Sequence, residues 1–95
     1  MSGSLMTGSK YFHISAVNTG TIKGAPGSLI SVVINTKIAS GVLTLYDSVN
    51  PGGTAIIAVI DCSGATTSLA YRLDFATGLS YALAGGNADI TISYA

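Results

Sequence analysis

Short runs in which apolar and polar residues alternate constrain the fold of this chain more than any other feature of its sequence. The clearest run spans Thr67–Phe75, and its apolar members are Leu69, Tyr71, Leu73 and Phe75. A second run, Ala88–Tyr94, repeats the pattern with Ala88, Ile90, Ile92 and Tyr94. Because successive side chains of a strand point to opposite faces, each run predicts a strand with one buried face and one wet face. No stretch of the sequence has a convincing helical period.

Two other runs, Leu29–Asn35 and Thr54–Asp61, are apolar on both alternating faces. Strands of this kind lie at the centre of a packed fold, or they press one face against a neighbouring subunit. The pattern leaves both arrangements open for each run.

Four shorter runs complete the set: Tyr11–Ala16, Thr21–Gly24, Gly41–Asp47 and Gly78–Leu83. Between the runs lie residues that favour turns: Asn18-Thr19-Gly20, Ala25-Pro26-Gly27, Asn50-Pro51-Gly52-Gly53, Ser63-Gly64, Thr77-Gly78 and Gly85-Gly86-Asn87. About eight strands at roughly ten-residue spacing predict an all-β, single-domain antiparallel β-sandwich or jelly-roll-like barrel over residues 10–95. Residues 1–9 lack periodicity and are expected to form a flexible N-terminal arm outside the core.

Charged residues make up only 8% of the chain, whereas soluble domains have about 25%. Four Lys and Arg residues are balanced by four Asp residues, so the net charge is zero and nucleic-acid binding is not expected. A surface this poor in charge favours burial against neighbouring molecules, as in a homo-oligomer. The alternative is a surface that Ser, Thr, Asn and Gly residues solvate well on their own.

The sequence also bears on the cellular compartment. Its longest aliphatic run, Ala55–Ile60, is far shorter than the roughly 18 residues that a membrane helix needs. Residues 1–6 have neither the basic region nor the apolar region of a secretory signal. Cys62 is the only cysteine, which excludes an intrachain disulfide. We therefore expect no membrane contact and synthesis in the cytoplasm.

Few residues in the sequence could carry catalysis. His13 is the only histidine and has no carboxylate or thiol near it in sequence, so it is expected to face solvent or a subunit contact. A nucleophilic Cys62 would need His13 brought beside it in space. The chain has no Glu, and its Asp residues fit turns and polar strand faces better than an acid–base pair. We therefore expect no catalytic residues and no enzyme.

Metal and cofactor sites are not expected either. Residues 47–50 and 87–89 place oxygen ligands near glycine turns, where Ca²⁺ could bind, but they lack the spacing and the bidentate Glu of an EF-hand. Neither GxxxxGK[ST] nor GxGxxG occurs, so no phosphate-binding loop is encoded.

Tyrosines divide into two groups by their place in the alternating pattern. Tyr71, Tyr81 and Tyr94 follow the core period, while Tyr11 and Tyr46 are better candidates for the surface. A surface tyrosine offers a large ring and a polar tip, which suit a protein interface or a sugar. The candidate interaction residues are Tyr11, His13 and Tyr46.

Three segments of the chain resemble small virion proteins of tailed phages. The first segment, Ser31–Thr36, contains VINT, and the second, Gly41–Asp47, has the pattern G-x-hydrophobic-T-hydrophobic-Y-D. The third, Thr77–Tyr94, begins with TGL and ends with ADITI-x-Y. The resemblance implies a virion structural component, namely a decoration (cement) protein that binds the major capsid protein as a trimer on the capsid exterior. The same rhythm would also suit a neck, tail or fibre-associated part, and a carbohydrate- or receptor-binding module is the alternative from another class.

Overall fold

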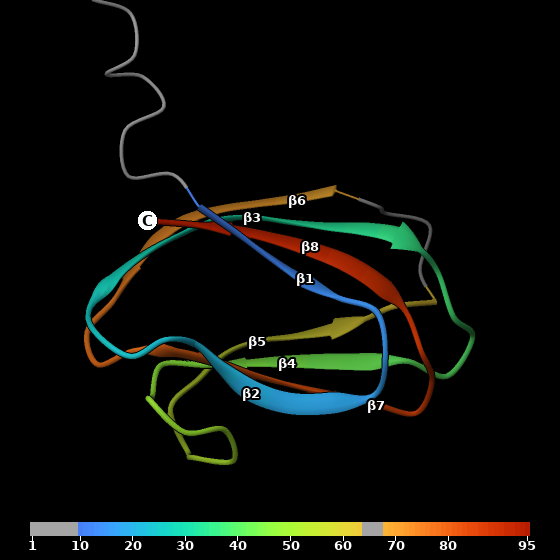
Figure 1. Ribbon diagram of the computed structural model, residues 1–95, viewed down its shortest axis with the longest axis horizontal. Helices are drawn as coiled ribbons and strands as arrows, with labels where there is room; N and C mark the ends of the chain where they lie inside the picture. The colour runs from blue at the N-terminus through green and yellow to red at the C-terminus, as the bar shows by residue number, and fades with distance from the viewer. Residues whose placement is uncertain (1–9, 64–67) are drawn as a thin grey trace, which may run out of the picture.

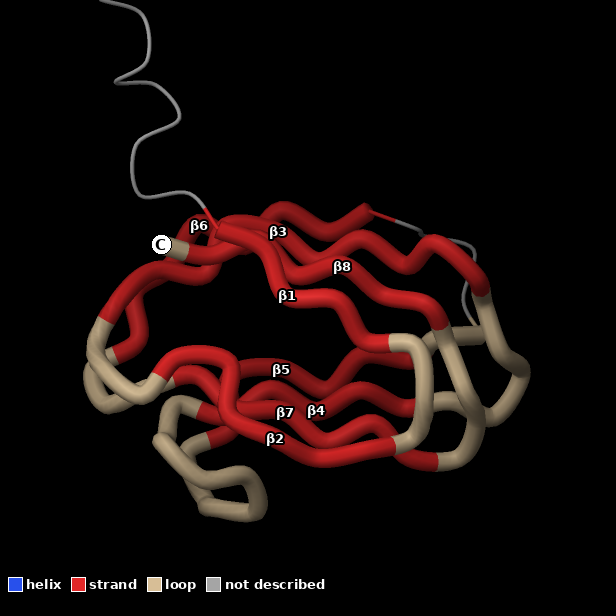
Figure 2. The backbone as a smooth tube through the Cα atoms, viewed as in Figure 1, coloured by secondary structure: helices blue, strands red, loops and turns tan. Residues whose placement is uncertain are grey.

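The computed structural model describes residues 10–63 and 68–95, so the predicted arm, residues 1–9, lies outside the described part, as do Gly64 and Thr67 of the predicted turn and strand. Eight strands follow one another along the chain: β1 (Lys10–Ile14), β2 (Asn18–Lys23), β3 (Gly27–Thr36), β4 (Val42–Tyr46), β5 (Ile56–Asp61), β6 (Ser68–Phe75), β7 (Leu79–Ala84) and β8 (Asp89–Tyr94). They form two layers that face each other (Figures 1 and 2). In this described part, no helix is long and apolar enough to span a bilayer.

The strand order is that of a jelly roll. One sheet, here called sheet A, has the order β1-β8-β3-β6, and the other, sheet B, has the order β2-β7-β4-β5. All neighbours are antiparallel, and β1 pairs with β8, β2 with β7, β3 with β6 and β4 with β5. The chain thus resembles one long hairpin rolled over on itself, which is the eight-stranded, two-sheet form of this fold. The predicted all-β sandwich of about eight strands is confirmed.

Apolar side chains from both sheets fill the space between the layers. The fully buried ones include Leu29, Val32, Leu43, Leu45, Leu79, Ile90 and Ile92. Phe12 of sheet A meets Tyr81 of sheet B with ring centroids 5.4 Å apart and a tilt of 54°, a geometry that aromatic pairs favour. The predicted core faces of β6 and β8 both point into this layer.

The two strands with apolar residues on both faces take different places. β3 lies between β8 and β6, as expected of a central strand. Its register shifts between Leu29 and Ser31, and this bulge lets Leu29 and Val32 both reach the core although they are three residues apart. β5 is instead an edge strand, paired with β4 alone. For β5 a central position is therefore ruled out, and contact with a neighbouring subunit stays a prediction.

One predicted turn is wrong. Asn18-Thr19-Gly20 does not reverse the chain but forms the first half of β2, paired with residues 81–83 of β7. Gly20 is needed there for space, because a Cβ atom at this position would lie 3.1 Å from Cε1 of Tyr81. Gly in a strand often marks such a close approach, and sequence alone does not separate this role from turn formation.

Candidate functional site

Outward-facing side chains of sheet A form a largely polar surface, here called the polar face. The strand register places Tyr11, Ser93, Ser31 and Ala70 in one row and His13, Thr91, Val33 and Ser68 in the next. These residues alternate with the core residues of the same strands, which is why they share one face. The rows contain no Lys, Arg or Asp.

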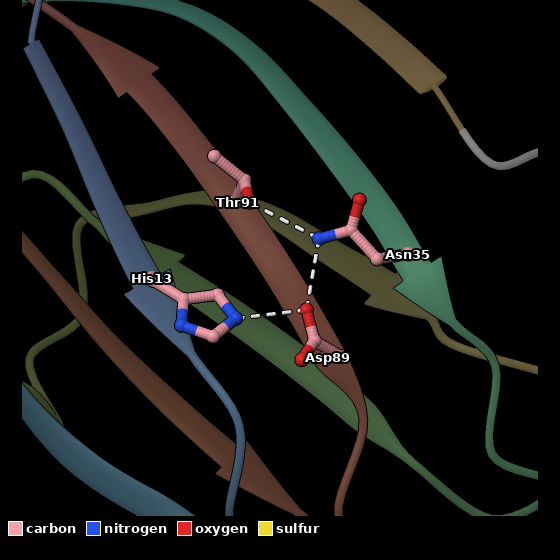
Figure 3. A network of polar contacts seen from close by, with 4 residues as sticks. All are labelled: His13, Asn35, Asp89 and Thr91. Atoms are coloured by element: carbon pink, nitrogen blue, oxygen red, sulfur yellow. Dashed lines mark hydrogen bonds and ion pairs between the residues drawn. The ribbon is translucent and has the colours of Figure 1, made fainter.

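A network of polar contacts crosses three strands at one end of the polar face (Figure 3). His13 of β1 places Nε2 2.8 Å from Oδ1 of Asp89 in β8. Asn35 of β3 donates from Nδ2 to the same oxygen at 2.9 Å and to Oγ1 of Thr91 at 3.0 Å. Because a carboxylate oxygen only accepts, the His13 proton in this contact resides on Nε2.

The network is open to water and its electrostatics are modest. The side chains of His13 and Asp89 are 48% and 36% exposed, and exposed pairs of this kind are screened by solvent. The hydrogen bonds from His13 and then Asn35 lower the pKa of Asp89. Protonation of Asp89 at low pH would remove the negative charge that strengthens the hydrogen bonds joining the three strands.

Tyr11 extends this polar face toward the other end of β1. It lies two residues before His13 on the same side of the strand, and its side chain is 73% exposed. Tyr11 and His13, both expected from sequence to contact a partner, therefore belong to one surface. Their contact with a partner remains a prediction.

Exposed apolar side chains gather on the outward face of sheet B, along β4 and β5. We call the set of Val42, Ile56 and Val59 the apolar strip; their side chains are 39%, 53% and 63% exposed. Val59 stands opposite Thr44, with Val42 as its diagonal neighbour, and Ile56 stands opposite Tyr46.

The loop between β4 and β5 covers one end of the outward face of sheet B. In Figure 1 it folds back beneath β2. Thr21 of β2 donates to the carbonyl oxygen of Val49 in this loop at 2.6 Å, and Ser48 lies 3.2 Å from Ser80, Oγ to Oγ. Ser80 is consequently fully buried although it points away from the core. The apolar strip lies outside the area that this loop covers.

Tyr46, the third predicted interaction residue, is only half-buried and lies in sheet B between Ile56 and Ser80. It therefore does not join Tyr11 and His13 but borders the apolar strip. The three residues named from sequence thus fall on two opposite faces of the sandwich.

Asp47, one of the oxygen ligands considered for Ca²⁺, is engaged by the backbone instead. Its carboxylate accepts N–H bonds from Ala76 at 3.0 Å, Thr77 at 2.8 Å and Gly78 at 3.4 Å. These bonds, with that from Ala76 first, lower the pKa of Asp47. Both carboxylate oxygens of Asp47 therefore bind N–H donors, whereas a cation site needs oxygens that are free to bind the ion. The described residues also hold no cluster of three or more His, Cys, Asp or Glu that could bind a metal.

Cys62 and His13 do not form a catalytic pair in this fold. The Cys62 thiol is fully buried in the core, and burial raises its pKa, which disfavours the reactive thiolate. His13 lies on the polar face of sheet A, outside that core.

Comparison with known proteins adds no assignment. No protein-family model matches the chain, and no curated protein matches it.

Two parts of these surfaces were not identified from sequence. Asp89 meets His13 across 76 residues, and no local pattern encodes a contact between the first and last strands. Val42, Ile56 and Val59 were not named as interaction residues, although the two-sided apolar pattern of Thr54–Asp61 was a signal for them.

Proposed function

We propose that this chain is a non-enzymatic structural protein of a phage virion, a capsid decoration (cement) module that self-associates and stabilises the capsid from its exterior. The observation that carries the proposal is the apolar strip, because exposed apolar side chains on one strand pair mark a contact surface. Its partner would be the major capsid protein, or another virion protein if the chain belongs to a neck, tail or fibre.

Two further observations support this proposal. Viral capsid domains are among the proteins that use the jelly roll, although a fold alone does not determine function. Only 8% of the residues are charged, so contact with a lattice desolvates few ionised groups. The resemblance to small virion proteins favours a trimer.

Binding of this kind stabilises by mass action. A protein that binds the assembled capsid but not its dissociated subunits raises the free energy of disassembly in proportion to its affinity and concentration. No covalent chemistry is needed.

The test is binding to capsids of the encoding phage that lack this protein, followed by sedimentation. Wild type is expected to co-sediment and to raise the temperature at which the capsids break. Val42→Lys is expected to weaken binding by about tenfold or more, because it places a charge in a desolvated contact. Val49→Lys is the matched control, since Val49 has the same 39% exposure but lies in the β4–β5 loop. Failure of wild type to bind would refute the proposal.

A second candidate function is a carbohydrate- or receptor-binding module on the polar face. The exposed ring of Tyr11 beside the Asp89 network combines a stacking surface with hydrogen-bonding groups. A glycan array would show binding that Tyr11→Ala abolishes and Tyr46→Ala leaves intact. An array without hits would remove this candidate.

A further inference from the structure

We infer that the free edge of β5 pairs with β5 of a second copy of this chain, antiparallel and about a two-fold axis near Val59. The pairing joins two copies of sheet B into one eight-stranded sheet. It goes beyond the proposed virion function and does not depend on it.

Backbone groups of Val59 point away from β4. Cys62 donates its N–H to the carbonyl oxygen of Gly41 at 2.9 Å, which continues the β4–β5 register. Antiparallel pairs alternate between bonded and non-bonded, so Leu43–Ile60 is a bonded pair and Thr44–Val59 is not. Both the N–H and the C=O of Val59 therefore face the open edge, ready to exchange two hydrogen bonds with Val59 of a second copy.

The other three edge strands carry features that protect edges from pairing. β1 has five residues and includes Lys10 and His13. β2 shifts register near its end and finishes at Lys23. β6 contains Arg72 in a left-handed conformation, φ 50°, at a register shift. Short length, charge and bulges are the usual protections of sheet edges.

β5 equals β2 in length and likewise has one register shift and one terminal charge, but it differs from β2 in its exposed apolar side chains. Its register shift lies at its start, opposite Leu45 and Tyr46, and leaves residues 58–61 regular. Its only charge is Asp61, at its last position, and its exposed apolar side chains are Val59 and Ile56.

Charge and symmetry select a second copy, in antiparallel orientation, as the partner. About the two-fold axis, Val59 meets its own counterpart and Asp61 lies opposite Ile57 of the second copy. The two Asp61 carboxylates then lie at opposite ends of the joined strands, four residues or roughly 13 Å apart, beyond the Debye length of about 8 Å. The chain has no net charge to oppose self-association. A two-fold contact also closes after two copies and leaves β2 as the outer edge.

Pairing through one strand of six residues buries less surface than the ~1,200–2,000 Å² of a stable interface. The dimer is therefore expected to form reversibly as concentration rises, and to be favoured further where copies are held close together. A two-fold contact gives twice the monomer mass, so it is separate from the trimer that the virion resemblance favours.

The first test is sedimentation velocity of the full chain over a wide range of concentration. Wild type is expected to shift from monomer to dimer. Val59→Pro removes the outward N–H without breaking a bond to β4, a position where edge strands tolerate proline, and is expected to weaken dimerisation by about tenfold or more. Val59→Thr keeps the N–H and is the matched control, expected to dimerise as wild type does. A monomer at every concentration, or dimerisation unchanged by Val59→Pro, would overturn the inference.

A covalent test covers the case in which the proline variant does not fold. In a bonded antiparallel pair the Cα atoms lie about 5.5 Å apart, within the roughly 4.4–6.8 Å that a disulfide spans. Val59→Cys is therefore expected to form a disulfide-linked dimer under mild oxidation, while Val49→Cys in the loop does so much more slowly. The native Cys62 is fully buried and does not interfere. Equal rates for both variants would contradict the pairing, whatever the outcome of capsid binding.

Discussion

At the residue scale, single backbone positions decide whether the strands can be connected as they are. Gly85 follows β7 with φ 87°, and Gly52 in the β4–β5 loop has φ 94°. These are left-handed conformations that glycine adopts without steric cost. At Gly85 a Cβ atom would also collide with the carbonyl oxygen of Ser40, whereas at Gly52 the space is open. Both the backbone conformation and the lack of space therefore require glycine at position 85.

Gly85→Ala is expected to lower the free energy of unfolding by roughly 1–3 kcal/mol, because it adds strain to the backbone and a steric clash. Gly24→Ala is the matched control, since a Cβ there meets nothing within 4 Å and the position lacks a left-handed φ. Its effect is expected to stay within about 0.5 kcal/mol. Urea unfolding measures both, and equal losses would show that Gly85 is not special.

At the scale of elements, one carboxylate links the two sheets. Asp47 follows β4 of sheet B, and the backbone groups it binds, Ala76 to Gly78, connect β6 of sheet A to β7 of sheet B. Its own N–H donates to Ala55 at 2.7 Å, at the far end of the β4–β5 loop. Asp47 thus fixes two loops relative to each other and holds the crossing point between the layers.

Asp47→Asn is expected to lower the melting temperature at neutral pH, because the amide presents one acceptor oxygen where the carboxylate presents two. The pKa of Asp47 is lowered in the folded state, so its contribution is present above its ordinary value of 3.8 and is lost as the pH falls through the folded value. Wild type should therefore lose more stability on acidification than Asp47→Asn does.

Melting followed by circular dichroism from neutral pH to below pH ~3 tests this expectation. Asp74→Asn serves as the control, since Asp74 accepts from the hydroxyl of Ser28 and should give a smaller loss at neutral pH. Parallel curves for wild type and Asp47→Asn would show that the bonds from Ala76 to Gly78 do not couple to stability.

At the scale of the whole molecule, the chain closes on itself through its ends. β1 pairs with β8, so the first and last described strands are neighbours in sheet A. Contacts this distant in sequence make folding slow and cooperative. Every buried side-chain nitrogen or oxygen of the described residues has a hydrogen-bond partner, which fits a core that opens as one unit.

Cys62 provides a probe of that opening. Its thiol is fully buried and its pKa is raised by burial, so labelling by an aromatic disulfide reagent requires unfolding. Native protein is expected to react at least ~1,000-fold more slowly than protein in concentrated urea. Val49→Cys, with its exposed loop thiol, should react at once. Rapid labelling of wild type without urea would indicate local opening near Gly41 and Cys62.

Much of the fold and part of the candidate surfaces could be predicted from the sequence. Alternation of side chains is local, so it identified the eight strands, the core faces of β6 and β8, and the exposure of Tyr11. Alternation could not predict the partner of His13, the strand role of Gly20 or the edge position of β5. Each depends on which strands become neighbours, and that is set by how the whole chain rolls up.

The sequence by itself therefore determined which faces of β6 and β8 are buried and that the chain carries little charge. Only the tertiary structure decided which of the remaining apolar side chains are exposed at the surface. The apolar pattern of β3 and β5 is nearly the same, yet strand order buries one between two neighbours and leaves the other with a free edge. The physical reason is that a side-chain period fixes the faces of a strand, whereas backbone hydrogen bonds between distant segments fix its neighbours.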